Sequence, residues 1–290
     1  MRSTPLGNTG IEVSVLGFGG MPLSIRGRPP EPTAREVLHA VFDAGIDFID
    51  TADVYCLDDS DLGHNERLIA SVLAERRDRD RIRVATKGGL RRPLGAWVTD
   101  SSPQRLIKAC ERSLRALGVD RIFVYQLHAP PRDTPFQKSI ETLGQLKDAG
   151  KIEHIGLSNV SVADLRTASR IVDVVTVQNR LSPFYREPIR DGVLAECDKK
   201  GITFLAYSPL GGKRRSRTLA DVPALQTIAH ARGVSPHAVA VAWVRATGKR
   251  VVPIPAASSV EHARDTARAA EIELTPGELD SIHHTRFSDV

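Results

Sequence analysis

The sequence has few cysteines and no long apolar run. Its 290 residues include three cysteines, Cys56, Cys110 and Cys197, and no pair has the Cys-x-x-Cys spacing of zinc or redox sites. An odd number of scattered cysteines is typical of free thiols in a reducing compartment. No run of about 18 apolar residues indicates a transmembrane helix, and no apolar run near the start indicates a signal peptide. We therefore expect a cytoplasmic protein without membrane association.

Signals for metal and nucleic-acid binding are also missing. The nine histidines form neither an H-x-H nor an H-E-x-x-H motif, and His64 and His128 lack obvious co-ligands, so no metal site is expected. The net charge is +5, but the basic residues are mostly arginines scattered along the chain. The densest cluster, Lys213–Arg217, has no interleaved aromatic side chains on which bases could stack. We interpret the excess as a coding bias and expect no nucleic-acid partner.

The remaining composition is that of an ordinary globular protein, with 41% apolar and 26% charged residues. A chain of this length can form two domains, but single α/β barrels also reach this size. Folding can bury roughly three quarters of the surface that the unfolded chain exposes. No linker breaks the sequence, so residues 1–290 are expected to form one domain.

Strand-like and helix-like segments alternate along the chain. Alternating βα units imply a parallel sheet with right-handed crossovers, and eight units favour a closed (β/α)8 TIM barrel. The strand candidates are 15–18, 46–50, 82–86, 122–127, 152–157, 173–177, 202–207 and 250–254. The helix candidates are 33–44, 64–76, 102–117, 135–149, 161–170, 188–200, 235–246 and 260–269.

Two additional elements flank this repeat. At the N-terminus, Thr4–Gly7 and Ile11–Ser14 surround the turn sequence Asn8-Thr9-Gly10, which predicts a β-hairpin. Near the C-terminus, a ninth helix is expected at about 276–286, because Thr275 begins a capping box and a proline follows it.

A doubly wound open sheet is the alternative fold. Such sheets bind dinucleotides through a G-x-G-x-x-G turn between the first strand and its helix. Here Gly17-Phe18-Gly19-Gly20 follows the first strand, but Pro22 and a further loop of about ten residues precede the helix. This loop is a poor phosphate cradle, so a nicotinamide cofactor would have to be bound in another way.

Four residues end strand-like runs or follow them directly: Asp50, Tyr55, Lys87 and His128. In a parallel barrel the carboxyl ends of all strands converge on one face. A tyrosine can act as a general acid beside a cation that lowers its pKa. Lys87 can supply that charge, Asp50 can pair with the lysine, and His128 can donate a hydrogen bond to a carbonyl oxygen. Each residue alone also has a structural interpretation, but the four together predict a proton-transfer site.

Eight short stretches occur along the chain in a fixed order, and in this order they resemble the aldo-keto reductases over nearly the whole chain. They are Gly17-Phe18-Gly19-Gly20-Met21, Asp47-Phe48-Ile49-Asp50-Thr51-Ala52, Gly63-His64-Asn65-Glu66, Ala85-Thr86-Lys87, Gln126-Leu127-His128, Gly150-Lys151-Ile152 with Ile155-Gly156-Leu157-Ser158-Asn159, Gln178-Asn179, and Ala206-Tyr207-Ser208-Pro209-Leu210-Gly211.

This resemblance implies an oxidoreductase that reduces an aldehyde or ketone with NADPH. Asp50, Tyr55, Lys87 and His128 fall on the family tetrad, with Tyr55 as the proton donor. The N-terminal hairpin would close the bottom of the barrel. The implied cofactor contacts are Gly20, Met21, Asp50, Ser158, Asn159, Gln178, Tyr207, Ser208, Leu210, Gly211, Ser258, Ser259 and His262. Ser158, Asn159 and Gln178 would bind the carboxamide, Tyr207 would stack on the nicotinamide, and the residues after it would meet the pyrophosphate.

The adenosine end departs from the family pattern. Where NADPH-preferring members often carry a lysine, a serine and then an arginine, this chain has Ala256, Ser258, Ser259 and His262. A 2′-phosphate usually pairs with a fixed cation, and histidine is only partly charged at neutral pH. We therefore expect NADPH to be preferred, with NADH accepted as a weaker alternative.

The substrate side is less defined. Trp97 is a candidate pocket wall, against simple packing, and Arg91, Arg92 and Arg132 near the mouth would favour anionic substrates. The expected partner is a small carbonyl compound, and the expected state is a monomer or weak homo-oligomer. Two alternative functions are a cofactor-binding regulatory subunit with little turnover and a barrel lyase that uses Lys87 as a Schiff-base amine.

Overall fold

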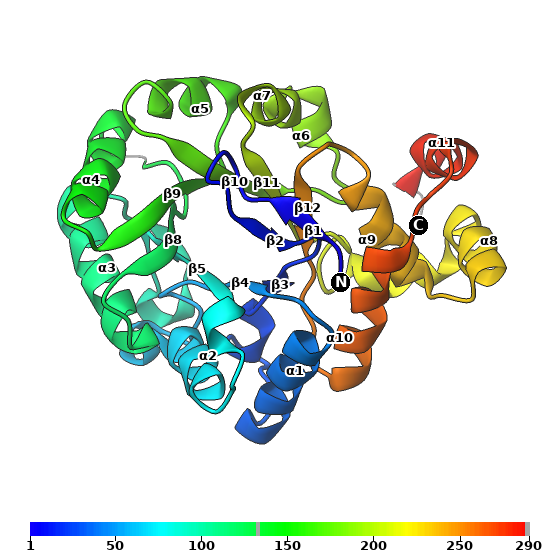
Figure 1. The fold of residues 1–290 in the computed structure, drawn as a ribbon, viewed down its shortest axis with the longest axis horizontal. Helices are drawn as coiled ribbons and strands as arrows, with labels where there is room; N and C mark the ends of the chain where they lie inside the picture. The colour runs from blue at the N-terminus through cyan, green and yellow to red at the C-terminus, as the bar shows by residue number, and fades with distance from the viewer. Residues whose placement is uncertain (132–133, 288–290) are drawn as a thin grey trace.

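A computed structural model describes residues 1–131 and 134–287. Eight parallel strands form the centre of the molecule, with helices around them (Figure 1). Backbone hydrogen bonds from Gly17 to Pro253 and from Gly19 to Pro255, each 2.9 Å long, join the two edge strands. In chain order the strands are β3 (Phe18–Gly19), β4 (Phe48–Asp50), β5 (Arg83–Gly88), β8 (Ile122–Leu127), β9 (Ile152–Ser158), β10 (Val174–Arg180), β11 (Thr203–Tyr207) and β12 (Val251–Ile254).

The strands are short, apolar and almost fully buried, because helices cover the sheet from outside and side chains fill its interior. None of the helices among the described residues combines the length and apolar character needed to cross a membrane. The α-helices are α1 (Glu31–Asp43), α2 (His64–Ala74), α3 (Pro103–Leu117), α4 (Phe136–Asp148), α5 (Val162–Ala168), α6 (Glu187–Arg190), α7 (Val193–Lys200), α8 (Pro223–Arg232), α9 (Pro236–Arg245), α10 (Val260–Ala267) and α11 (Pro276–His284). Short 3-10 turns are η1 (Met21–Leu23), η2 (Asp59–Asp61), η3 (Arg79–Arg81), η4 (Pro93–Gly95), η5 (Arg215–Asp221) and η6 (Arg268–Glu271).

The expected hairpin forms from β1 (Ser3–Pro5) and β2 (Glu12–Ser14) and closes the N-terminal end of the barrel. Leu6 and Val13 pack in one buried cluster with residues that point inward from the strands. The backbone N–H of Gly7 donates to the Thr203 hydroxyl at the start of β11, at 2.7 Å. A side chain on Gly7 would lie 2.9 Å from Val175, so only glycine fits this approach. The open, C-terminal face of the barrel is therefore left for a site.

Eight barrel strands were predicted, and the closed barrel replaces the doubly wound alternative. Seven overlap their predicted ranges closely, whereas the first, expected at 15–18, is observed at Phe18–Gly19. The helix expected at 188–200 is instead two helices, α6 and α7, because Gly192 adopts a left-handed conformation with φ 84° between them. Helix α8 was missed, although Leu225, Ile228 and Ala229 form a buried helical stripe and Gly233 caps its end. The ninth helix is present as α11, and Thr275 caps it through the expected capping box.

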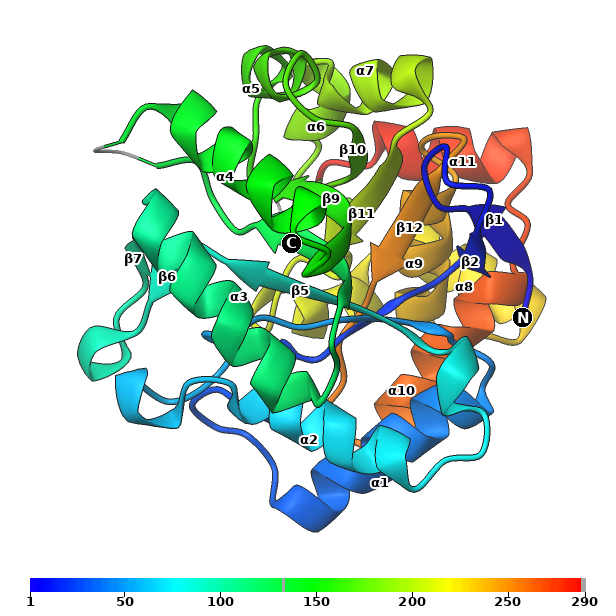
Figure 2. The same ribbon diagram turned by 60° about the vertical axis from the view of Figure 1, so that its left-hand side comes forward.

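A small antiparallel pair, β6 (Leu90–Arg91) and β7 (Val98–Thr99), was also not predicted. Strands this short, separated by η4, carry almost no alternating pattern in the sequence. The pair extends the loop after β5 and lies at the end of the barrel opposite the N-terminal hairpin (Figure 2). It therefore belongs to the face on which the strands end.

A buried polar layer separates β5 from α2 and α3. Thr86, whose side chain points outward from β5, donates to one oxygen of Glu66 at 2.6 Å. Asp53 lies nearby and accepts from Arg112 at 2.6 Å. Burial, together with the negative charge of Asp53, raises the pKa of Glu66 to about 7. Glu66 is therefore partly protonated at neutral pH.

We predict that Glu66→Gln stabilises the protein at alkaline pH but not in mild acid. The folded pKa of Glu66 lies above its ordinary value of 4.5, so the proton contributes stability that is complete below pH 4.5 and lost as pH rises through 7. Glutamine keeps the acceptor for Thr86 and does not ionise. Urea unfolding should show that the variant gains about 2 kcal/mol more at pH 8 than at pH 5. Glu36→Gln, exposed on α1, is the control; an equal effect of Glu66→Gln at both pH values would contradict the prediction.

Candidate active site

Lys87 brings the predicted residues together inside the C-terminal end of the barrel. Its ammonium donates to the Asp50 carboxylate at 2.6 Å, to the Tyr55 hydroxyl at 2.9 Å and to the Thr51 carbonyl at 3.0 Å. Neighbouring strands supply the pair, since Asp50 ends β4 and Lys87 lies near the end of β5. All three N–H donors of the Lys87 ammonium are thus used, and the lysine side chain is completely buried.

The second oxygen of Asp50 is held from across the barrel. Gln178 on β10 donates to it at 2.7 Å, and Gln126 on β8 donates at 3.1 Å. Gln178 was predicted as a cofactor contact, but Gln126 was given no role. The signal was its position two residues before His128, because alternate residues of a strand face the same side. Asp50 therefore has a fixed orientation toward the lysine.

Burial and neighbouring charges together set the protonation states of Lys87 and Tyr55. Desolvation would lower the pKa of Lys87, but the Asp50 charge and the Tyr55 hydroxyl outweigh it and raise the pKa. For Tyr55, burial raises the pKa and the positive charge of Lys87 opposes it, and burial prevails. The charge of Lys87 lowers the phenol's pKa, as expected, but burial, which the expectation left out, outweighs this effect. At neutral pH Lys87 is charged and Tyr55 is a neutral phenol.

His128 directly follows β8, and its ring meets the Tyr55 ring edge to face with centroids 5.9 Å apart. Burial, together with the charge of Lys87, holds the pKa of His128 well below its usual range. The imidazole is therefore neutral. Its Nδ1 atom is buried and has no hydrogen-bond partner among the described residues. An uncharged ring beside the phenol can donate one hydrogen bond to a neighbouring oxygen.

The loop that carries Tyr55 is fixed from behind by the start of α2. The backbone N–H of Asn65 donates to the Tyr55 carbonyl at 3.3 Å. The Asn65 side chain accepts from Thr51 at 2.6 Å and donates to the Gly20 carbonyl at 2.9 Å. In the sequence Asn65 stands out only as part of a short motif. Its role was not predicted, because it depends on three separate loops that meet at one amide.

Several predicted cofactor residues form a linked polar rim beside His128. Tyr207, which ends β11, donates to the Asn159 side chain at 2.9 Å, and that amide donates to the Ser158 hydroxyl at 3.1 Å and to the His128 carbonyl at 2.9 Å. Asn159 and Ser208 have positive φ values of 59° and 50°, which only a few per cent of residues other than glycine adopt. Strained backbone of this kind is concentrated at ligand sites.

Gly20, Met21 and Gly211 were also predicted as cofactor contacts. Gly20 leaves no room for a side chain, since a Cβ there would lie 2.5 Å from the Asn65 amide oxygen. Met21 packs beside the Tyr55 cluster. Gly211 has φ 82° and lies against Phe184. Gly20 and Met21 thus lie beside Asp50 and Tyr55, and Gly211 follows β11.

Ser258, Ser259 and His262, which were predicted for the adenosine end, lie at the start of α10. Ser259 caps the helix by accepting from the His262 backbone N–H at 3.3 Å. Ser258 and the His262 ring are exposed. A capped helix start with exposed polar side chains can accept an anion through backbone donors.

Trp97, the predicted pocket wall, lies next to Tyr55. Its ring meets the Tyr55 ring edge to face at 6.4 Å, and Arg92 lies on its face. Arg91 is half-exposed and pairs with Asp100. Arg132 lies outside the described residues.

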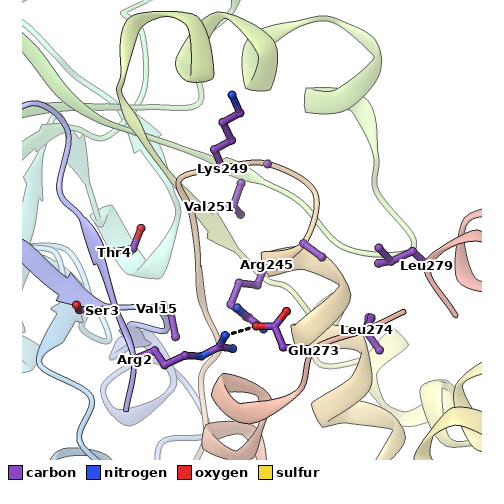
Figure 3. A pocket seen from close by; sticks show the side chains of 12 residues that line it. Arg2, Ser3, Thr4, Val15, Arg245, Lys249, Val251, Glu273, Leu274 and Leu279 are labelled. Atoms are coloured by element: carbon purple, nitrogen blue, oxygen red, sulfur yellow. Dashed lines mark hydrogen bonds and ion pairs between the residues drawn. The ribbon is translucent and has the colours of Figure 1, made fainter. Parts of the chain in front are cut away.

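A separate hollow of about 420 Å³ lies at the other end of the barrel (Figure 3). It is lined by Arg2, by Val15 directly after β2, by Val251 at the start of β12, and by Arg245 and Glu273. Arg2 forms an ion pair with Glu273 inside it. The lining includes none of the predicted catalytic residues, as far as the structure describes them, so the hollow is distinct from the candidate active site.

Comparison with known proteins gives one consistent answer. The chain is 34% identical over 278 residues to a protein named 6-dehydroglucose reductase from Novosphingobium aromaticivorans, which spans 92% of this chain and 90% of that protein. It is 27% identical, with a TM-score of 0.83, to a glycerol dehydrogenase from Gluconobacter oxydans, covering 97% of this chain and 93% of that one. An aldo/keto reductase from Klebsiella pneumoniae in complex with NADP and acetate is also 27% identical, with a TM-score of 0.81, covering 97% of this chain and 94% of that one.

The family model of the aldo/keto reductases matches residues 15–286, which is almost the entire described chain. This match agrees with the nearly closed barrel and with the reductase relative. It supports an oxidoreductase role and the use of NADP(H). The chain belongs to the Aldo/keto reductase family.

Proposed function

We propose that this protein reduces an aldehyde or ketone to an alcohol with NADPH, and that Tyr55 donates the proton. The observation that carries the proposal is the buried Lys87, hydrogen-bonded to both Asp50 and Tyr55 at the C-terminal end of the barrel. Loops at this end of a (β/α)8 barrel carry the active site in characterised enzymes. The oxidoreductase relatives support the same class of reaction.

The cofactor would be held along the polar rim from Ser158 to Gly211, with Ser259 and His262 at its far end. When bound, the nicotinamide supplies the hydride. Asn159 and Gln178 offer amide groups that suit a carboxamide, since they donate and accept together. Tyr207 offers an aromatic face at low entropic cost. In this arrangement Asp50 and Lys87 lie beside the nicotinamide end of the site.

The chain's own residues handle the proton. The Tyr55 phenol donates its proton to the carbonyl oxygen as that oxygen gains negative charge. Lys87 stabilises the phenolate that this leaves, and Asp50 keeps the ammonium in place. His128, being neutral, donates a hydrogen bond to the same oxygen and orients it. The raised pKa of Lys87 keeps the amine protonated, which disfavours the Schiff-base lyase.

The substrate class is narrowed by a relative. The reductase from Novosphingobium aromaticivorans is named for a sugar-derived carbonyl compound. We propose that sugar aldehydes and ketones are accepted here as well, alongside simpler carbonyl compounds.

We predict that Tyr55→Phe lowers kcat for carbonyl reduction by about 10²–10⁴-fold, because one positioned proton donor is lost. NADPH affinity, measured by quenching of intrinsic fluorescence, should be unchanged. The control is Tyr125→Phe, since Tyr125 is also buried but donates to the Leu106 carbonyl outside the barrel interior. A normal rate in Tyr55→Phe would remove the tyrosine from the mechanism.

We predict opposite pH dependence for the two directions of the reaction. Reduction needs the protonated Tyr55 phenol, and its raised pKa keeps it protonated to above pH 10. It also needs a neutral His128, and the lowered pKa of that ring keeps it neutral at pH 6.5 and above. The reduction rate should therefore be level between pH 6.5 and 10. Oxidation needs the phenolate and should rise about tenfold per pH unit over this range. Steady-state kcat/KM in both directions checks this, and a reduction rate that falls from pH 7 to 9 would contradict it.

We predict that NADPH is preferred over NADH, but by less than a fixed arginine at the adenosine end would provide. His262 is exposed and the nearby Ala256 cannot pair with a 2′-phosphate. Introducing a cation by His262→Arg should increase the ratio of kcat/KM for NADPH over NADH, since arginine binds phosphate through two parallel hydrogen bonds. Equal kcat/KM for NADPH and NADH in the wild-type protein would refute the preference. Binding of both cofactors without any turnover would instead favour the alternative of a regulatory subunit.

A further inference from the structure

Arg92 joins the two loops that form one side of the active-site mouth. It follows β6, in the loop after the strand that carries Lys87, and it is only 4% exposed. One guanidinium nitrogen donates to the carbonyls of Cys56 and Leu57, both at 3.2 Å. These two residues directly follow Tyr55. Arg92 therefore fixes the chain immediately beyond the proton donor.

The backbone of Arg92 reinforces this connection. Its N–H donates to the Asp59 carboxylate at 2.7 Å, and the Asp59 N–H donates back to the Arg92 carbonyl at 3.0 Å. The loop after β4 and the loop after β5 are thus joined by four hydrogen bonds that all involve one residue.

The same guanidinium supports the aromatic wall. Its central carbon lies 3.8 Å from the centre of the Trp97 ring, which is close stacking. The same Trp97 ring also makes the edge-to-face contact with Tyr55. Trp97 is 47% exposed, so a large part of the ring is left uncovered next to the phenol. The uncovered part of the Trp97 ring is therefore free to contact a ligand that lies beside Tyr55.

The guanidinium of Arg92 forms no close ion pair. Among the described residues no carboxylate pairs with it within 4.0 Å, and its Nε and Nη1 atoms are buried without hydrogen-bond partners. Beyond that distance its charge contributes, after the hydrogen bonds from Ser60, to the lowered pKa of Asp58. Burying such a group is costly unless something compensates. The two carbonyls and the Trp97 ring are the compensation that this structure offers. Lysine could not reproduce it, because it lacks the planar group that stacks.

We propose that Arg92 is a positioning residue for substrate selection, which holds Trp97 as a wall beside Tyr55 for carbonyl compounds that carry a flat ring. The inference rests on the proposed carbonyl reduction and deepens it. Arg92 acts through Trp97 and does not touch the reacting atoms. An acyclic aldehyde reaches Tyr55 without using the wall.

The test compares 4-nitrobenzaldehyde with propanal in Arg92→Met, Arg92→Lys and Trp97→Ala, and 4-carboxybenzaldehyde serves as an additional, anionic probe. Each variant should raise KM for the aryl aldehyde about tenfold, while kcat/KM for propanal stays within about twofold. The matched control is Arg91→Met, since Arg91 is the adjacent arginine, is half-exposed and pairs only with Asp100 among the described residues. Because Trp97 is exposed, Trp97→Ala should fold even if Arg92→Met does not.

A second readout is independent of turnover. The chain has two tryptophans, so Trp243→Phe leaves Trp97 as the reporter. In that background 4-nitrobenzaldehyde should quench the fluorescence, and Arg92→Met should weaken this binding about tenfold. If the protein has no reductase activity but Arg92→Met still weakens the quenching, the proposed function is refuted. The inference that Arg92 holds Trp97 as a binding surface then stands.

Three results would overturn the inference. Equal losses for both aldehydes would mean that Arg92 only maintains the Tyr55 loop. Losses confined to 4-carboxybenzaldehyde, with 4-nitrobenzaldehyde unaffected, would mean that the guanidinium binds anions directly. Full activity in Arg92→Lys would mean that stacking on Trp97 is not required.

Discussion

The buried ammonium of Lys87 is the constraint on which the rest of the site depends. A fully buried charge must be paired and fully hydrogen-bonded, or it is lost as a charge. Asp50, the Thr51 carbonyl and Tyr55 meet this requirement together. Since Asp50 and Lys87 lie on adjacent strands and Asp50 is held by glutamines from two others, the pairing and the closed barrel depend on each other.

Burial also explains why the charge states differ so sharply within a few ångströms. Removing water raises the pKa of Tyr55 and lowers that of His128, while the nearby carboxylate keeps Lys87 charged. A neutral acid, a neutral hydrogen-bond donor and one fixed cation result. One dry pocket with one carboxylate is therefore enough to set three different charge states, and no separate environment is needed for each group.

The sequence was sufficient for the barrel and for the four central residues, because alternation of strands and helices is local and strand ends converge by topology. It was insufficient where a residue's role depends on contacts between loops. Gln126 and Asn65 appeared only within short motifs, although each joins segments distant in the chain. The direction of the Tyr55 pKa shift was also out of reach, because burial is a property of the packed structure. Helix α8 is different: its pattern was present and was overlooked.

The support around Tyr55 is divided between two sides. Behind it, Asn65 binds the Tyr55 carbonyl, and the buried layer with Asp53 and Arg112 packs against the same loop. In front, Arg92 holds the next residues and the Trp97 ring. The rear support comes from helices of the barrel, which cannot change without disturbing the core. The front support comes from loops, which tolerate change. Substitutions in front can therefore alter the substrates of the proposed reduction while Tyr55 keeps its place.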